Sequence, residues 1–207
     1  MKDYVKSITI NHAYHSTFTM GSFSSNLDYD PAEPEVLGKD VVPQYRIQDI
    51  NITEQFNPLI GIDIGWQKNW TSNFEYRTAR NVSFSFANYQ TTQISSREFV
   101  VGIGWKTKEM KLPFKVRKKK TILQHEVTFR LDMSIKDDKS MIYKLDEGLT
   151  QAVGGSQTFA LAPRIDYLLS KNLKASLFFK RNVNTPIIST SFPTAFTSIG
   201  FSFTYTL

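Results

Sequence analysis

Residues 123–135 read LQHEVTFRLDMSI, and this stretch decides the fold. From Val127 to Ile135 every odd position is apolar and every even position is polar or charged. Because successive side chains of a β-strand point to opposite faces, this period of two predicts a strand with one apolar and one polar face. We expect this strand to cover residues 121–137 or to extend to 146.

The same alternation recurs along the whole chain. It predicts further strands over residues 5–23, 45–67, 70–88, 97–107, 157–169, 172–184 and 197–207. No segment has the apolar spacing of an amphipathic helix. The sequence therefore predicts an all-β, antiparallel, up-and-down arrangement of about eight strands.

Composition narrows the class of protein. The chain has 207 residues, of which 41% are hydrophobic and 14% aromatic, and it contains no cysteine. This length suits one domain or part of a larger one, and the apolar content excludes a disordered chain. A disulfide framework is impossible, and no apolar run is long enough for a transmembrane helix.

Strand length and aromatic placement favour a transmembrane β-barrel in a bacterial outer membrane. The predicted strands exceed the roughly 9–11 residues that cross a bilayer. Aromatic residues at the predicted strand ends are typical of the girdles at a membrane interface; they are Trp66, Trp70, Tyr76, Trp105, Tyr143 and Tyr167. A soluble β-barrel that binds an apolar ligand, or a β-sandwich, has the same alternation and remains an alternative.

The predicted connections suggest an orientation. Short turns at 67–69 and 170–172 belong to one edge of the sheet, whereas longer polar links at 24–44, 89–97, 147–156 and 184–196 belong to the other. Outer-membrane barrels have short periplasmic turns and longer extracellular loops. The long link at 106–120 is an exception on the short-turn edge.

Both ends of the chain bear on export and insertion. The sequence after Met1 lacks the apolar segment of a signal peptide, so we expect an exported chain of this kind to be the tail of a longer precursor. The last strand resembles the C-terminal insertion signal of outer-membrane proteins, which Phe201, Phe203, Tyr205 and Leu207 would form.

Several strings resemble one family. They are VKSITINHAYHST (5–17), GSF (21–23), NITEQFNPLIG (51–61), KLPF (111–114) and RNVNTP (181–186). Together they resemble the C-terminal region of the SprA/Sov family, the outer-membrane translocon of the type IX secretion system. The likeness extends over essentially all 207 residues.

The resemblance implies that the chain supplies the C-terminal strands of a much larger barrel. Such a barrel carries secreted proteins across the outer membrane and, in gliding members, surface adhesins. The implied partners are the lipid bilayer, the remainder of the barrel, the cargo proteins, a small companion barrel and a periplasmic plug protein. The alternative is a complete eight-stranded barrel that serves as an anchor or an enzyme.

Charged residues on the polar parity are the candidates for a lumen lining. They are Asp63, Glu75, Arg77, Glu126, Arg130, Asp132, Arg164, Asp166, Lys174 and Lys180. In a closed eight-stranded barrel they would form an interior salt-bridge network, because such an interior has room only for side chains. In a wide barrel they would line a hydrated pore, either by contacting cargo or simply by keeping the wall wet.

One segment carries the positive charge of the chain. Its basic residues are Lys106, Lys108, Lys111, Lys115, Arg117, Lys118, Lys119 and Lys120, and Glu109 is its single acid. It therefore accounts for more than the whole net charge of +6, so a basic surface suited to nucleic acid is not expected elsewhere. We interpret the segment as a periplasmic turn that is solvated or contacts anionic lipid or an acidic partner.

No pattern predicts catalysis or a cofactor. The three histidines, His12, His15 and His125, lack acidic or histidine neighbours at the spacing of a metal site. Gly102-Ile103-Gly104 lacks the strand-to-helix context of a phosphate-binding loop. We therefore expect no enzyme activity, cofactor, metal or nucleic-acid partner.

Overall fold

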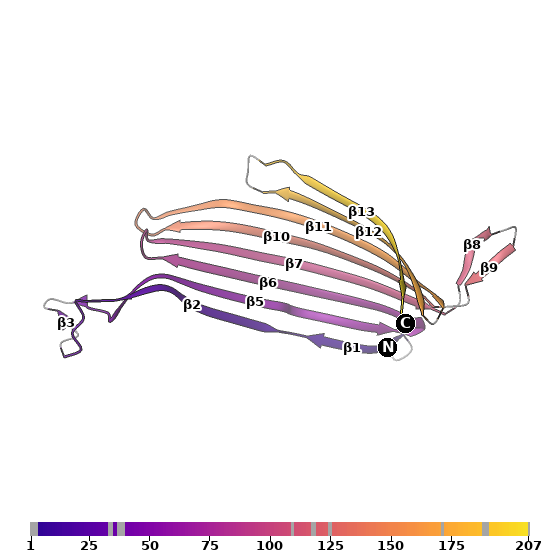
Figure 1. The fold of residues 1–207 in the computed structure, drawn as a ribbon, viewed down its shortest axis with the longest axis horizontal. Helices are drawn as coiled ribbons and strands as arrows, with labels where there is room; N and C mark the ends of the chain where they lie inside the picture. Colours follow the sequence, from indigo (N-terminus) through magenta and orange to yellow (C-terminus); the bar gives the residue numbers. More distant parts are fainter. Residues whose placement is uncertain are drawn as a thin grey trace.

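The chain forms one antiparallel sheet with two small hairpins beside it (Figure 1). The computed structural model describes residues 4–32, 35–36, 40–108, 110–116, 119–123, 126–170, 172–187 and 191–206. Within the hairpin strands at 35–36, 40–41, 110–116 and 119–123 it describes the backbone only.

Nine strands form the main sheet. Their order is β1(Val5–Asn11), β5(Tyr45–Trp66), β6(Trp70–Ser85), β7(Gln90–Thr107), β10(Val127–Lys144), β11(Leu149–Ser170), β12(Leu173–Pro186) and β13(Thr194–Tyr205), and β2(Tyr14–Ser25) also pairs with β5. All pairs are antiparallel and, β2 aside, neighbouring strands in the sheet follow one another along the chain. The predicted all-β, up-and-down arrangement is confirmed.

The hairpins involve β3(Glu35–Val36) with β4(Asp40–Val41) and β8(Met110–Val116) with β9(Lys119–Leu123). A short 3-10 turn, η1(Gln67–Asn69), joins β5 to β6. We call the side of the sheet where the strands end at η1 and at the β11–β12 turn the turn edge. The start of β1 and the end of β13 also lie there (Figure 1).

The predicted first strand is interrupted. β1 ends at Asn11 and β2 begins at Tyr14, opposite a register shift in β5 between Phe56 and Ile60. Around this break Ala13 N donates to Pro58 O and Asn57 N donates to Ala13 O, both at 3.0 Å. A local irregularity in β5 therefore splits the edge strand without removing it from the sheet.

The predicted long links at 89–97 and 147–156 are wrong. These residues lie mostly in β7 and β11, and the connections shrink to residues 86–89 and 145–148. Apolar residues are few there and do not alternate, so the sequence shows no period of two, yet Thr91 and Thr92 pair with β6 and β10 through the backbone. The predicted contrast between short connections at one edge of the sheet and long connections at the other is therefore weaker than expected.

The predicted strand at 121–137 is also corrected at its start. Residues 119–123 belong to β9, which pairs with β8, and the strand of the main sheet runs from Val127 to Lys144. His125 lies outside the described residues.

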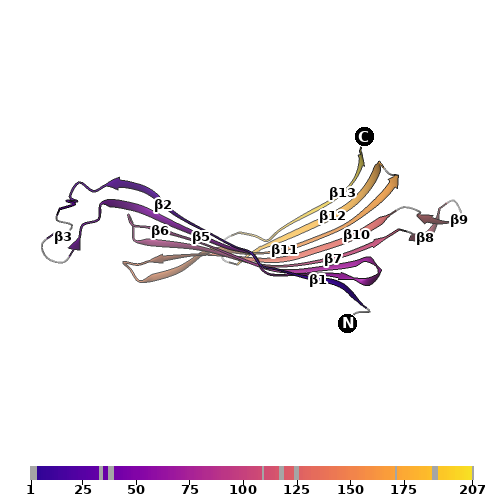
Figure 2. The same cartoon turned by 90° about the horizontal axis from the view of Figure 1, so that it is seen from below.

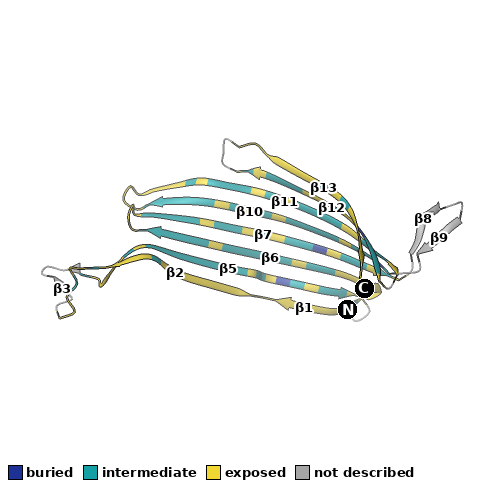
Figure 3. Cartoon of the chain, in the orientation of Figure 1, coloured by how far each residue is buried: buried dark blue, intermediate teal, exposed yellow. Residues whose placement is uncertain are grey.

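The sheet is a single curved layer (Figure 2). Among the described residues only Val127 is a buried hydrophobic residue, at 2% exposure, and most strand residues are half-buried or exposed (Figure 3). Large apolar side chains such as Phe201, at 75% exposure, have no second layer to cover them. The described residues therefore do not enclose the apolar interior that a ligand-binding soluble barrel needs.

The sheet is open in the structure. Within the described residues, β13 pairs with β12 alone, and β1 and β2 pair with β5 alone. Both outer strands thus present unpaired backbone groups along one side.

Candidate functional site

The candidate site is the polar face of the main sheet. Cross-strand register places the polar-face positions of β5, β6, β7, β10, β11 and β12 on the side opposite Phe129 and Leu131. All ten residues predicted from alternation follow this parity; they are Asp63, Glu75, Arg77, Glu126, Arg130, Asp132, Arg164, Asp166, Lys174 and Lys180. The structure brings most of them into small clusters rather than one centre.

The first cluster joins β6 and β7. Arg77 Nε donates to Glu75 Oε2 at 2.8 Å, and Arg77 Nη1 lies 3.4 Å from Glu98 Oε2. Asn73 Nδ2 donates to the other oxygen of Glu75 at 2.9 Å. Sequence reasoning missed Glu98, although its even position beside Phe99 is the signal that would have found it.

The second cluster surrounds Asp166. Arg164 Nε donates to Asp166 Oδ1 at 3.0 Å, Lys174 Nζ lies 3.4 Å from Oδ2, and the Ser176 hydroxyl donates to Oδ1 at 2.5 Å. Ser176 is only 5% exposed, the one buried polar residue among those described. It was missed because a small hydroxyl in a strand has no distinctive pattern.

The remaining pairs are local. Arg130 Nε bonds Asp132 Oδ2 at 2.8 Å, and Lys136 Nζ bonds Asp138 Oδ2 at 2.9 Å. Each pair joins residues two apart, which share one face of a strand. Asp63 accepts from Asn11 Nδ2 at 2.7 Å, whereas Lys180 has no ion pair among the described residues.

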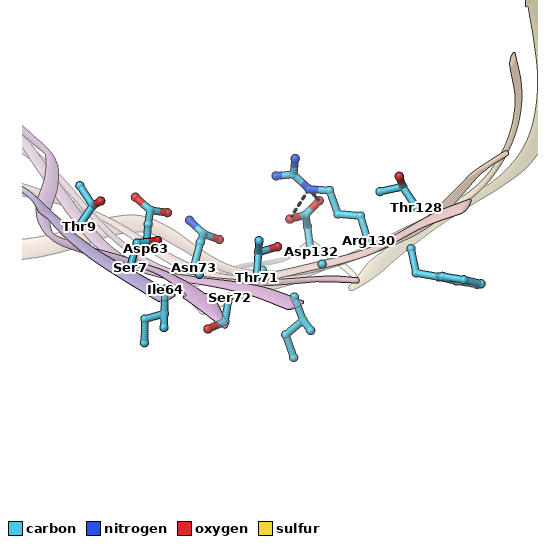
Figure 4. A pocket seen from close by; sticks show the side chains of 15 residues that line it. Ser7, Thr9, Asp63, Ile64, Thr71, Ser72, Asn73, Thr128, Arg130 and Asp132 are labelled. Carbon is cyan, nitrogen blue, oxygen red and sulfur yellow. Dashed lines mark hydrogen bonds and ion pairs between the residues drawn. The ribbon is translucent and has the colours of Figure 1, made fainter. Parts of the chain in front are cut away.

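A shallow hollow lies between two of these groups (Figure 4). Its volume is about 490 Å³. In Figure 4, Asp63, Asn73, Asp132 and Arg130 stand on the polar side, whereas Ile64 points to the other side. A Cβ at Gly102 would clash with Asn73 Oδ1. Glycine therefore lets neighbouring polar side chains lie down over the floor of the hollow.

The electrostatics of this face are balanced. The ten predicted residues comprise five acids and five bases. Their ion pairs remain accessible to solvent, with Arg130 at 65% and Asp132 at 35% exposure. Solvated pairs of this kind contribute about 0–1 kcal/mol each to stability. Their main effect is to give a hydrated wall with little net charge.

The opposite face carries an apolar band next to the turn edge. Trp105 stacks on Trp70 at 5.5 Å and on Phe129 at 5.4 Å between ring centroids, and Tyr76 stacks on Phe99 at 4.6 Å farther along. Tyr76 thus lies within the sheet, so the prediction that it sits at a strand end is wrong; it follows Trp70 by six positions.

The band ends at a polar belt on the same face. Past Ile135 and Phe99 comes Asp137 opposite Arg97. The Glu54–Arg80 ion pair of β5 and β6 lies two residues farther along, level with Ser95 of β7. Beyond the belt a second apolar group occupies β2, β5 and β6; its members are Phe18, Met20, Ile50, Ile52, Val82 and Phe84. The strands are therefore about twice as long as the apolar band.

The basic segment lies at the turn edge. Lys106 Nζ bonds Glu126 Oε1 at 2.8 Å, and Lys108 is exposed. The side chains of its other basic residues lie outside the described part of the structure; these residues are Lys111, Lys115, Arg117, Lys118, Lys119 and Lys120.

The C-terminal strand ends at the same edge. Phe201, Phe203 and Tyr205 share the face of the apolar band and are 64–75% exposed, and Leu207 lies outside the described residues. Phe201 and Phe203 meet edge to face at 6.0 Å.

The part of the chain that the structure describes contains no group of three or more potential metal ligands. It also contains no helix with the length and apolarity needed to span a bilayer. No protein-family model matches the chain, and no curated protein matches it.

Proposed function

We propose that this chain forms part of the wall of a large outer-membrane β-barrel that conducts secreted proteins. The observation that carries the proposal is an open sheet with an apolar band on one face and paired, hydrated charges on the other. A membrane barrel needs an apolar exterior and, when it forms a channel, a polar interior. The resemblance to the type IX translocon supplies the class of cargo, which is secreted proteins and adhesins.

The open edges favour a large barrel over a complete small one. In lipid, unpaired backbone groups at a sheet edge are costly, so β13 and the β1–β2 edge require neighbouring strands. In an eight-stranded barrel β1 and β13 would pair with each other, and the interior would be filled by side chains. The half-exposed charges on the polar face are consistent with a lumen wider than that.

Partners follow from the same proposal. The lipid bilayer covers the apolar band, and the remainder of the barrel covers both edges. Cargo passes along the polar face, where a wall with balanced charge holds polypeptides weakly. The resemblance adds a small companion barrel and a periplasmic plug protein.

The first experiment tests membrane residence. We expect the protein to fractionate with the outer membrane, to require detergent for extraction, and to migrate differently on gels before and after heating. A protein that stays in solution without detergent would refute the proposal.

The second experiment tests closure. The chain has no cysteine, so one pair of cysteines can be introduced at a time without a competing thiol. Examples are Thr9→Cys with Ser202→Cys, and Thr9→Cys with Gly200→Cys. We expect no disulfide between β1 and β13, whereas the control pair Lys180→Cys with Ser198→Cys, opposite each other in β12 and β13, should oxidise. A β1–β13 disulfide would favour the small barrel.

The third experiment tests transport. Depletion of the protein from its native cells should leave secreted proteins in the periplasm. Unchanged export would refute conduction while leaving the barrel intact.

A further inference from the structure

The tryptophans of the chain gather at one place on the apolar face. All three, Trp66, Trp70 and Trp105, lie at the turn edge. Trp66 Nε1 donates to Ser72 Oγ at 2.7 Å, which fixes that indole against the sheet. Trp70 is held on its other side by the stack with Trp105. The rings are therefore ordered before any ligand arrives.

Two hollows adjoin Trp70. The first, about 760 Å³, lies between Trp66 and Trp70 and reaches inward to Ser72 and Ile103. The second, about 550 Å³, lies between Trp70 and Trp105 and reaches outward to Lys108. Lys68 lines both. These volumes fall within the range of ligand sites, roughly 300–1,000 Å³.

The charge around the hollows has one sign. Neither is lined by an acidic residue, and neither Lys68 nor Lys108 makes an ion pair among the described residues. Lys68 occupies the middle of η1 with φ 59°, a left-handed conformation that few side-chain-bearing residues adopt. The backbone thus holds this lysine at the tip of the turn.

We propose that this cluster is a binding site for an anionic phospholipid. The phosphate contacts Lys68 and Lys108, and an acyl chain lies in the hollow between Trp66 and Trp70, over Ile103. Tryptophan and lysine are among the side chains that favour the headgroup level of a bilayer. The inference rests on the proposed membrane position of the apolar band and adds a headgroup preference at its turn edge.

The test uses tryptophan fluorescence of the purified protein in vesicles. Lipids brominated near the headgroup quench nearby indoles, so phosphatidylglycerol and phosphatidylcholine carrying the same bromines are compared. We expect stronger quenching by the anionic lipid, with a relative affinity about fivefold higher for each lysine engaged. Because the bromines are on acyl chains, bound inorganic phosphate gives no signal.

Variants locate the effect. Lys68→Gln with Lys108→Gln should bring the anionic preference close to one, whereas Lys180→Gln, on the polar face, should leave it unchanged. Gel migration before and after heating verifies that each variant is folded. Equal quenching of the parent by both lipids, or a preference that persists in the double variant, overturns the site alone. Absence of quenching by either lipid overturns the proposed membrane position and the site with it.

Discussion

An arginine in the middle of the apolar band should lower the free energy of unfolding much more than an arginine at the same depth on the polar face. Val101 lies there, opposite Phe74 of β6 and Met133 of β10. The neighbouring residue Val100 points to the polar face, opposite Glu75 and Ser134. Both valines are half-buried and lie at nearly the same depth, so Val101→Arg and Val100→Arg differ chiefly in face.

The expected magnitude follows from depth. Arg97, which the protein already carries on the apolar face, lies four residues from Val101. At about 3.4 Å per residue this is about 14 Å along the strand, or about 10 Å along the membrane normal for a strand tilted near 45°. Val101 would thus be close to the mid-plane, where arginine on a lipid-facing position costs about 2–4 kcal/mol.

Val100→Arg gains an acidic neighbour in Glu75 and should change the free energy of unfolding by less than about 1 kcal/mol. A difference of 2–4 kcal/mol corresponds to about a 30- to 700-fold change in the ratio of folded to unfolded protein. Urea titration in lipid vesicles, followed by the heat-sensitive gel shift, measures this ratio. If Val101→Arg is tolerated as well as Val100→Arg, the apolar band does not face lipid.

Other substitutions test particular contacts. Gly155→Ala should destabilise the protein by about 1–3 kcal/mol, because its Cβ would lie 2.8 Å from the backbone oxygen of Asp138. Gly154→Ala, whose nearest contact would be 3.8 Å, is the control, and equal urea midpoints for the two variants would contradict this reasoning. Asp166→Ala should lower the free energy of unfolding by about 1–3 kcal/mol, because it leaves Ser176 and two cations without their acceptor. Asp28→Ala breaks an exposed ion pair with Arg46 and should cost less than about 1 kcal/mol; a larger loss for Asp28→Ala in the same urea titration would contradict this. Trp105→Ala removes both ring stacks and should lower the thermal midpoint more than Tyr89→Ala, at an exposed turn residue that makes no ring stack among those described.

Alternation predicted most of the fold because it reports the pleat of each strand directly. Val127 to Ile135 is the clearest case, and the structure places its apolar residues on one face in register with Trp105, Ile103 and Phe99. The signal failed where both faces are polar, as at Thr91 and Gln93, because the period carries no information when neither parity is apolar. Backbone hydrogen bonding alone extends β7 there.

The site was predicted as a face but not as a set of contacts. Parity placed Glu75, Arg77 and Asp166 correctly on one side, yet it could not indicate that Glu98 joins Arg77 or that Ser176 bonds Asp166. Those contacts depend on cross-strand register, which turns and bulges determine. The register shift in β5 after Phe56 is such a feature; Pro58, which cannot donate to the ladder, marks it in the sequence, but parity does not.

The position of the polar belt indicates how the sheet would be placed in the proposed bilayer. In β7 the exterior is apolar only in the half next to the turn edge, whereas β2, β5 and β6 carry the second apolar group beyond the belt. A bilayer placed as we propose would cover the apolar band and leave the far half of β7 in water. The tryptophans and Lys68 then mark one interface, and Arg97 with Asp137 marks the other. If the turn edge lies at the periplasm, as we propose, the far half of the strands would form a wall that projects outside the cell. Emerging cargo would then remain beside the polar face for roughly another membrane thickness, which a barrel that ended at the membrane surface would not provide.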